Sequence, residues 1–534
     1  MDTGRAAILD PEPVAPGHLA ERPTRAVLAG SVAAAVALGF SELVASLGAS
    51  LPSLVVGVGG WFIDRSPGDV TRAAIETLGT ANKTVLIWTI VVVTITLGGV
   101  VGRVWWQRRS RAATAFGVTA IVGGLASVGE PGATAVGAAV VALVAAASGV
   151  GTYLLLWSAA DGRLGLEPAR TIESPTDPHA SRRSFLGFAG AGAAFAGLSA
   201  AGGRYALGRS PTEVAREAIV LPTLPAGSTS PLPDTEPGID GLSPLYTPND
   251  DFFRIDTALR VPQVDLDGWS MTIDGMVENP LTLTFDDLLA MDLVESDVTL
   301  ACVSNQVGGN LVGNARWLGV PLAELLERVG VDPGAEQVVG HSVDGFTAGF
   351  PLDVLDDGRP ALVAVGMNGE PLPLRHGFPA RLVVSGLFGY VSATKWLSRI
   401  ELAPWEGVNG YWIPRGWSKE GPVHTQTRID VPADRTTVAP GRIAVAGVAW
   451  APSRGVAQVE MRVDDGPWTE VELSEEIGDH AWRQWWTDWN AEEGTHILEV
   501  RSTDGTGETQ TETIRPPAPS GATGWHRIRV RVEA

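Results

Sequence analysis

One short segment concentrates an unusual set of side chains, and it reads Gly369-Glu370-Pro371-Leu372-Pro373-Leu374-Arg375-His376-Gly377-Phe378-Pro379-Ala380-Arg381. The apolar run that follows predicts a strand over Arg381–Ser385. Lys395 lies within twenty residues of His376. An imidazole, a forked guanidinium and an ammonium are fixed donors of the kind that hold a phosphate group. The segment therefore predicts an anion-binding site, and scattered surface salt bridges are the open alternative.

The distribution of charge makes this cluster stand out. Residues 1–203 hold 14 basic and 13 acidic side chains, whereas residues 204–534 hold 25 and 47. Within so acidic a region His376, Arg381 and Lys395 form a local cationic exception. We expect no nucleic-acid partner for a chain of net charge −21.

The chain contains one cysteine, Cys302, so an intramolecular disulfide is impossible. The apolar run Val298–Ala301 precedes it and reads as the end of a strand, and a turn over Gly308-Gly309-Asn310 follows. We therefore expect the thiol at a strand-to-loop junction, where backbone can be shaped around a ligand. A small buried hydrophobe is the alternative, because most free cysteines serve that purpose.

Taken in order, these features resemble the molybdopterin domain of the sulfite oxidase family. The resemblance covers about residues 245–534, and its most specific part is the block His376–Arg381. It also includes Asn314-Ala315-Arg316-Trp317, Asp344-Gly345-Phe346, Gly386-Leu387-Phe388-Gly389 and Lys395-Trp396. A soft thiolate ligand suits a heavy metal centre.

The resemblance implies a cofactor of molybdenum and molybdopterin, with Cys302 as the metal ligand. It also implies that Arg254 faces the metal and acts in catalysis together with Cys302. The residues that it assigns to the cofactor are Arg254, Asn305, Asp344, His376, Arg381 and Lys395.

Three positions depart from the family pattern. Gln306 replaces an arginine, Asp256 replaces a histidine, and Trp417 stands where animal sulfite oxidases carry a catalytic tyrosine. An indole cannot exchange a proton as a phenol does. Sulfite, a dianion, needs convergent cationic donors, and this chain offers Arg254 and Arg415. The fold and cofactor are thus expected to carry over better than the substrate.

The first 203 residues have the composition of membrane helices. We expect five spans, at about 26–48, 84–102, 112–129, 134–158 and 184–203. Arginines cluster at 103–111 and again at 163–183, which places these two loops and the N-terminus in the cytoplasm. Everything after the fifth span then lies outside, which makes the chain a multi-pass cell-membrane protein with an extracytoplasmic catalytic domain.

A second signal agrees with that topology. The segment 181–186, Ser181-Arg182-Arg183-Ser184-Phe185-Leu186, resembles a twin-arginine export signal, which serves proteins already folded around a cofactor. Two ordinary positive-inside arginines are the alternative. None of the eight histidines lies in the five spans, so we expect no haem there and a separate electron carrier.

The rest of the chain divides by pattern. Residues 204–245 are rich in Pro, Gly, Ser and Thr and predict a linker, and 246–425 alternate strands and helices as an α+β molybdopterin domain. Turn signals among alternating runs predict an immunoglobulin-like β-sandwich over 426–534. This part resembles the domain through which sulfite oxidases dimerise, so a homodimer is possible. Residues 406–430 read as a loop.

Two functions remain open. The first is an oxidoreductase that moves two electrons or an oxygen atom at a small substrate. The second is a non-catalytic membrane protein that keeps the fold for binding or assembly, which Gln306, Asp256 and Trp417 favour. A transporter is weakly supported, since the spans are Ala-, Val- and Gly-rich with little internal polarity.

Overall fold

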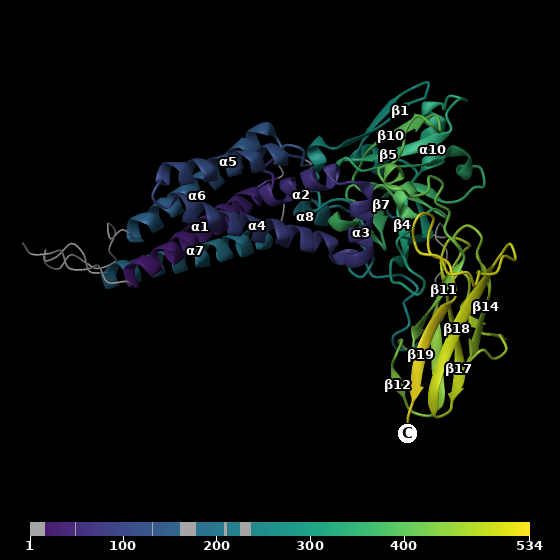
Figure 1. Cartoon of the computed structure of the whole chain (residues 1–534). Coiled ribbons are helices and arrows are strands. Elements are labelled where there is room, and N and C mark those ends of the chain that lie inside the picture. The colour runs from purple at the N-terminus through teal and green to yellow at the C-terminus, as the bar shows by residue number, and fades with distance from the viewer. Residues whose placement is uncertain (1–16, 49, 131, 161–177, 208–210, 225–236) are drawn as a thin grey trace, which may run out of the picture. The chain divides into compact units, whose positions relative to one another are not determined.

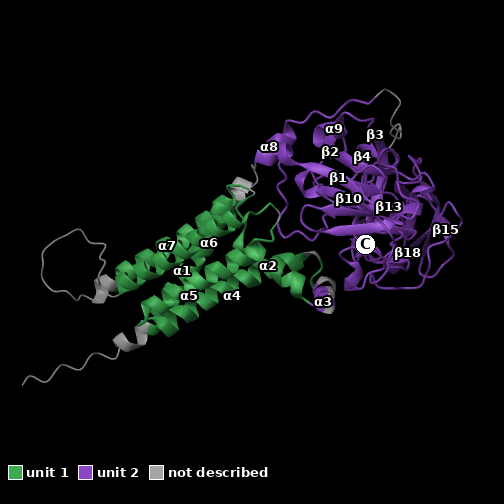
Figure 2. Ribbon diagram, turned by 90° about the horizontal axis from the view of Figure 1, so that it is seen from above, with its two compact units in different colours: residues 1–66, 78–209 green, residues 67–77, 210–534 purple. Residues whose placement is uncertain are grey.

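The computed structural model describes residues 17–48, 50–130, 132–160, 178–207, 211–224 and 237–534. The chain forms two compact units (Figure 2). The helical unit comprises the described residues within 1–66 and 78–209, and the β-rich unit those within 67–77 and 210–534.

The main helices of the helical unit are α1 Gly17–Ala45, α2 Leu54–Arg65, α4 Asn82–Trp105, α5 Arg109–Ser127, α6 Ala135–Ala160 and α7 Pro178–Leu207. Helix α1 packs against α4, α6 and α7 (Figure 1). Its contact with α4 is close because both helices carry glycine there. A methyl group added at Gly30 would come within 2.0 Å of the Gly98 carbonyl oxygen.

Helices α5 and α6 run antiparallel along each other's length. Phe116 of α5 lies near Gly149 of α6, and eight residues later Gly124 lies near Ala142. The buried residues of α5 recur from Ala112 to Ser127. The whole helix therefore packs on α6 rather than crossing it at one point.

Four helices of the described residues are long and apolar enough to cross a bilayer: Pro23–Ala45, Asn82–Trp105, Ala135–Ala160 and Arg182–Gly203. They match four of the five expected spans. The fifth, expected at 112–129, is helical as α5 but is not among the four, because Arg109 and Arg111 occupy its first turn. Between α1 and α4 lie two helices that were not predicted, α2 and α3 (Gly68–Leu78).

Glu42, an acidic residue within the first membrane-length helix, has a local partner. The Ser53 hydroxyl donates to Glu42 at 2.7 Å, and the Ser53 amide donates to Glu130 at 2.8 Å. Ser53 is the N-cap of α2, so the two carboxylates lie at a helix start.

Two sheets make up the first part of the β-rich unit. The first has the order β2-β1-β10-β5-β6, and the second has the order β3-β4-β7-β8 with β9 paired to β7. The bounds in the first sheet are β1 Ser270–Gly275, β2 Leu281–Thr284, β5 Gln337–Ser342, β6 Thr347–Pro351 and β10 Leu397–Ala403. Those in the second are β3 Val294–Ala301, β4 Val312–Pro321, β7 Ala361–Met367, β8 Glu370–Pro371 and β9 Arg381–Val384.

Short helices connect and cover these strands. They are α8 Pro211–Glu217, α9 Phe285–Leu289, α10 Leu322–Val329 and α11 Gly389–Ser392, with 3-10 turns at Leu266–Gly268, Leu352–Leu355, Leu374–His376 and Ile413–Arg415. Parallel pairing of β1 with β10 beside antiparallel neighbours makes the first sheet mixed. At the end of the expected linker Leu245 is buried in the core, so that end is docked.

A pair of sheets follows, here called the C-terminal sheet pair. One sheet has the order β11-β13-β17-β16 and the other β12-β19-β18-β14-β15. The long strands are β11 Gln426–Val431, β13 Gly441–Trp450, β14 Val456–Val463, β17 Arg483–Ala491, β18 Gly494–Asp504 and β19 His526–Val532 (Figure 1). The short ones are β12 Thr437–Val438, β15 Thr469–Glu470 and β16 Glu472–Leu473. Residues of both sheets share one apolar core.

The tryptophans of this region differ in burial. Trp482, Trp485 and Trp489 are buried, whereas Trp486 is half-buried. The expected loop over 406–430 is too long by its last residues, because Gln426 already begins β11. The run of alternating apolar and polar residues around Gln426 is too short to predict a strand by itself. Pairing with β13 makes this segment a strand.

Candidate functional site

A pocket in the β-rich unit gathers residues from both sheets and the loops between them. It encloses about 690 Å³ of empty space, including its open mouth, which is within the range of cofactor sites. It is lined by Phe252, Phe253, Ile255, Asp256, Thr257, Leu300, Ala301, Cys302, Ser342, Asp344, Phe346, Arg381, Gly389, Tyr390, Ala393, Lys395, Trp396 and Trp412.

Cys302 follows the last residue of β3 directly, as the sequence predicted, and its side chain lines the pocket. The Ser304 amide donates to Sγ at 3.4 Å. Burial raises the pKa of the Cys302 thiol, while the Ser304 hydrogen bond and the nearby Lys395 charge oppose that rise. The thiol is thus held in the neutral form until a stronger cationic partner is present.

Arg381 begins β9 and is 3% exposed. Its Nη1 donates to the His376 carbonyl at 3.1 Å, its Nε donates to the Leu382 carbonyl at 3.4 Å, and its guanidinium lies 4.8 Å from the Trp317 ring centre. Among the described residues it has no carboxylate partner. Burial without such a partner lowers its pKa to about 9. A buried cation in this state is a strong site for an anion.

Lys395 is the second buried cation of the pocket. Its Nζ donates to Asp256 and to the Arg375 carbonyl, both at 3.3 Å. Burial lowers its pKa to about 8, although Asp256 opposes the shift. Asp256 also accepts from Arg254 Nε at 2.8 Å. One carboxylate therefore lies between two cations.

His376 is fully buried and does not line the pocket. Its Nε2 lies 2.8 Å from the Asn249 carbonyl, which requires Nε2 to carry the proton, and its Nδ1 has no partner among the described residues. Burial and the positive charge of Lys395 lower its pKa to about 3, so the ring is neutral. Its backbone carbonyl, rather than its ring, is what touches Arg381.

Gly377 allows the two cation-bearing segments to meet. Its φ is +114°, and an added methyl group would lie 3.1 Å from atoms of both Arg381 and Lys395. The Trp396 amide donates to the Gly377 carbonyl at 3.2 Å, and Trp396 itself has a φ of +49°. Glycine is needed here for the close approach as much as for its backbone angle.

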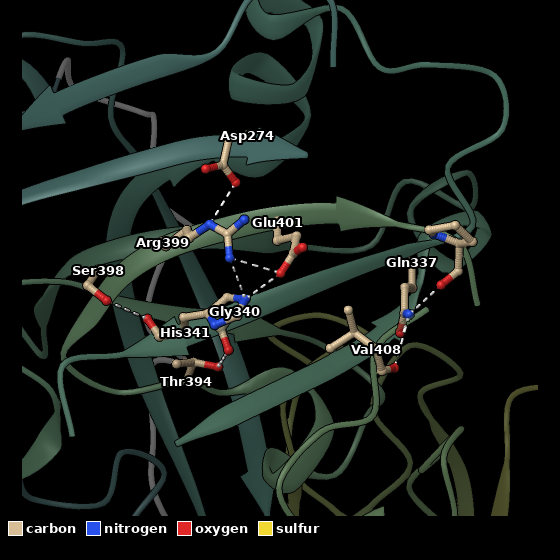
Figure 3. Close-up of polar contacts among 10 residues, drawn as sticks. Asp274, Gln337, Gly340, His341, Thr394, Ser398, Arg399, Glu401 and Val408 are labelled. Atoms are coloured by element: carbon tan, nitrogen blue, oxygen red, sulfur yellow. Dashed lines mark hydrogen bonds and ion pairs between the residues drawn. The ribbon is translucent and has the colours of Figure 1, made fainter. Parts of the chain in front are cut away.

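Figure 3 shows polar contacts that join strand β5 to Thr394 and to Val408. The Thr394 hydroxyl donates to the Gly340 carbonyl of β5 at 3.4 Å. The fully buried Gln337 donates to the carbonyls of Pro404 and Val408 at 2.6 and 3.1 Å (Figure 3). Strand β5 thereby holds the chain on either side of β10.

Other predicted residues have different positions. Asp344 lines the pocket, and its carboxylate accepts from the Phe346 amide at 3.1 Å. Asn305 does not line it; its side chain accepts from the Leu311 amide at 2.9 Å and so closes the Cys302 loop. Arg254 does not line it either and reaches the pocket only through Asp256.

Two expectations about the substrate side need correction. Trp417 packs on Tyr390 and Trp412 but does not line the pocket, whereas Trp412 and Trp396 do. Arg415 stacks 3.7 Å above the Tyr411 ring and does not line the pocket. The tight turn at 413–416 separates Trp412, which lines the pocket, from Arg415 and Trp417, which do not.

The residues present fit a phosphate-bearing cofactor with a thiolate ligand. Two buried cations and a thiol share one pocket, and Arg375 Nε and His376 Nδ1 are buried without partners among the described residues. Such orphaned groups are costly unless a bound group satisfies them. Within the described residues no cluster of three or more His, Cys, Asp or Glu side chains could hold a metal by itself.

Comparison with known proteins points the same way. A family model described as "Oxidoreductase molybdopterin binding domain" matches residues 258–412. The chain is 34% identical over 157 residues to the uncharacterized oxidoreductase YuiH of Bacillus subtilis, covering 29% of this chain and 76% of that protein.

Two longer matches are sulfite oxidases. The chain is 29% identical over 367 residues to the mitochondrial sulfite oxidase of Rattus norvegicus, covering 58% of this chain and 66% of that protein. It is 27% identical over 387 residues to the sulfite oxidase of Arabidopsis thaliana, covering 61% and 98%. The match thus spans just under two thirds of the rat protein and nearly all of the plant protein.

The buried cation leads to a first prediction. Because Lys395 has a pKa of about 8 in the folded protein and about 10.4 when unfolded, folding releases a proton between these pH values. The stability of cofactor-free protein should therefore rise with pH from about 8 to about 10. We expect Lys395→Met to stabilise this form at pH 7, by on the order of 1–3 kcal/mol, and to remove the rise.

Thermal unfolding across pH measures both effects. Arg328→Met, on the exposed side of α10, is the control and should change neither quantity. A loss of stability in Lys395→Met at pH 7 would contradict the prediction.

Proposed function

This chain belongs to the sulfite oxidase-type molybdopterin-binding oxidoreductases, and we propose that it is a membrane-anchored, extracytoplasmic enzyme that transfers two electrons and an oxygen atom at a small substrate. The observation that carries the proposal is the shared pocket of Cys302, Arg381 and Lys395. A thiol and two buried cations meet there although the sequence separates them widely.

Each site residue then has a role. Cys302 ligates molybdenum, for which a soft thiolate is suited. Arg381 and Lys395 neutralise the phosphate of the pterin, and His376 orients Arg381 through its backbone carbonyl. Asn305 closes the loop that carries the thiol, and Asp344 provides an acceptor on the pocket wall. The cofactor, when bound, supplies two-electron redox chemistry with transfer of one oxygen atom.

The domain limits follow the sequence. We assign 1–203 to the membrane region, 204–245 to the linker, 246–425 to the molybdopterin domain and 426–534 to an immunoglobulin-like domain. Two sheets with one apolar core support that last assignment. Half-buried Trp486, on the same strand as the core residue Trp485, is a candidate contact for a homodimer.

The topology depends on whether α5 crosses the bilayer. Its 19 residues span about 28 Å, close to the hydrocarbon thickness, and it packs along the full-length span α6. Five crossings from a cytoplasmic N-terminus put the loops after α4 and α6, which carry the arginines, inside and residues 204–534 outside. Arg182 and Arg183 are exposed in the first turns of α7, where a twin-arginine signal would be read.

The pocket's charge balance bears on the substrate. Its lining holds two carboxylates, Asp256 and Asp344, and two cations, Arg381 and Lys395. The cations are committed to the phosphate of the cofactor, and Arg254 is paired with Asp256. An incoming dianion would therefore meet no uncommitted cation among the described lining residues, while Phe253, Ile255 and Trp412 present apolar surface.

We accordingly propose that the substrate is a neutral sulfur or nitrogen oxide. Its reduction consumes two electrons and two protons and releases the reduced compound and water. The electrons come from a separate carrier that docks on the exported part. A non-catalytic binding role is the alternative, and it predicts a protein without metal.

The first test concerns Cys302. Wild-type protein from molybdenum-replete cells should contain stoichiometric molybdenum and pterin by elemental and fluorescence analysis. Cys302→Ser should fold normally and retain less than about 1% of the activity, because a hydroxyl is a poor ligand for a soft centre. Ser398→Ala, in β10 and outside the pocket, is the matched control. Folded wild-type protein with neither metal nor pterin would establish the non-catalytic alternative.

The second test concerns topology. Replacing Arg182 and Arg183 together with lysine preserves their charge but removes the twin-arginine signal. We expect the C-terminal unit of this variant to resist protease added to intact spheroplasts, whereas the wild-type unit is cleaved. Replacing Arg108 and Arg109 with lysine is the control and should leave export intact. A protected wild-type unit would show that the topology is wrong.

The third test concerns the substrate. With an artificial electron donor or acceptor, kcat/KM for a small sulfoxide or N-oxide should exceed that for sulfite by at least about tenfold. Asp256→Asn frees the charge of Arg254 and should lower the KM for sulfite by roughly tenfold, about 1.4 kcal/mol, with little effect on a neutral substrate. Efficient oxidation of sulfite by wild type, unaltered in Asp256→Asn, would refute the proposal.

A further inference from the structure

We propose that the C-terminal sheet pair holds the segment carrying Cys302 in place, and that Arg428 is its principal positioning residue. The Cys302 segment is defined here as residues 299–311, from the end of β3 through the following loop. Its attachment to the sheet pair is independent of the proposed function. Only the catalytic consequence rests on Cys302 being the metal ligand.

The first attachment lies three residues before the thiol. The Thr299 amide donates to the His480 carbonyl at 2.9 Å, and the Thr299 hydroxyl accepts from the Trp482 amide at 2.7 Å. Thr299 is 1% exposed, so water cannot replace these bonds. The loop before β17 thus fixes the end of β3 immediately upstream of Cys302.

The second attachment lies on the other side of the thiol. Arg428 of β11 donates from Nη1 to the Gly309 carbonyl at 2.7 Å and from Nη2 to the Ser243 hydroxyl at 2.9 Å. Its Nε pairs with Asp430 at 2.6 Å, and both side chains are about nine-tenths buried. One guanidinium therefore joins the Cys302 segment, the end of the linker and the sheet pair. Charge-assisted bonds in such a buried place are strong and directional.

A third contact, between Gly308 and the His526 ring, holds the same loop by close packing. Gly308 has a φ of +74°, and a methyl group added there would lie 2.2 Å from the His526 ring. The His526 ring is itself held, because its Nδ1 accepts from the Ile429 amide at 2.9 Å. Strands β19 and β11 thus form a rigid wall against the loop.

Between these attachments the segment pairs with β4 through Leu300 and Ala301, buries Val303 in the core, and forms short bonds of its own. The Cys302 amide donates to the Leu311 carbonyl at 2.9 Å, and the Asn305 amide donates to the Cys302 carbonyl at 3.0 Å. Releasing either flank would let the loop open as a unit and expose the thiol. Sheet-pair residues that never touch the pocket therefore control how well Cys302 is ordered within it.

The single cysteine makes this testable by chemical labelling. The full chain is purified in detergent from cells that cannot make molybdopterin, and the rate of reaction of Cys302 with a disulfide reagent is measured under native conditions. Arg428→Met should raise that rate by about tenfold or more, and Arg428→Lys should give an intermediate rate because one of several bonds is retained. Thr299→Val, which keeps its volume, should also accelerate labelling.

Two controls separate positioning from general stability. Arg442→Met breaks an exposed ion pair with Asp488 in the same sheet, and Val445→Ala weakens the apolar core of the sheet pair. Neither should change the labelling rate, even where the melting temperature falls. If Arg428→Met and Thr299→Val label as slowly as wild type, or if Val445→Ala accelerates labelling equally at the same melting temperature, the proposal is overturned.

The outcome stands apart from that of the proposed function. Faster labelling in Arg428→Met together with metal-free wild-type protein would uphold the positioning role and refute the enzyme. Unchanged labelling together with stoichiometric molybdenum would refute the positioning role and uphold the enzyme.

Discussion

Burial of two cations beside a thiol is the constraint on which the β-rich unit depends. Arg381 and Lys395 are almost without solvent, and one carboxylate, Asp256, partly offsets their charge while already paired with Arg254. Left alone, such an arrangement destabilises the fold. It is stable when an anionic group completes it, so the pocket links the folding of this unit to occupancy by a ligand. The strained Trp396 and the close approach at Gly377 serve the same arrangement.

The positive cluster was visible in the sequence because its members lie close together. Arg381 and Lys395 fall within one short stretch of an acidic region, and Cys302 is unique. The apolar runs also located two strands, since β9 begins at Arg381 and β3 ends at Ala301, as expected. These features are local, and local chemistry is what a single sequence records well.

The features that the sequence could not reveal depend on contacts between residues far apart in the chain, or on the backbone conformation of a single turn. Asp256 pairs with Lys395 across 139 positions, so its role in neutralising the pocket had no local signal. Trp412 and Trp417 are separated by one tight turn, and only the backbone of that turn decides which indole faces the cavity. The predicted roles of Arg254 and Asn305 as direct cofactor contacts remain predictions, because neither lines the pocket. For helix α5, sequence and packing point in different directions. Its arginines shorten the apolar stretch that the sequence shows, but its packing on α6 extends along the whole helix.

This geometry gives the C-terminal sheet pair a positioning role in addition to a role in association. A domain that served only for association would contact its neighbour mainly through apolar surface. Here it adds hydrogen bonds to the main chain on both sides of Cys302, at Thr299 and at Gly309. These bonds hold the two ends of the loop, while the Asn305 side chain and the backbone angle of Gly308 set its shape. Gln306, which departs from the family pattern, is an exposed residue of that loop. The metal-binding part and the sheet pair are therefore one mechanical unit, and the order of the thiol depends on contacts made outside the pocket.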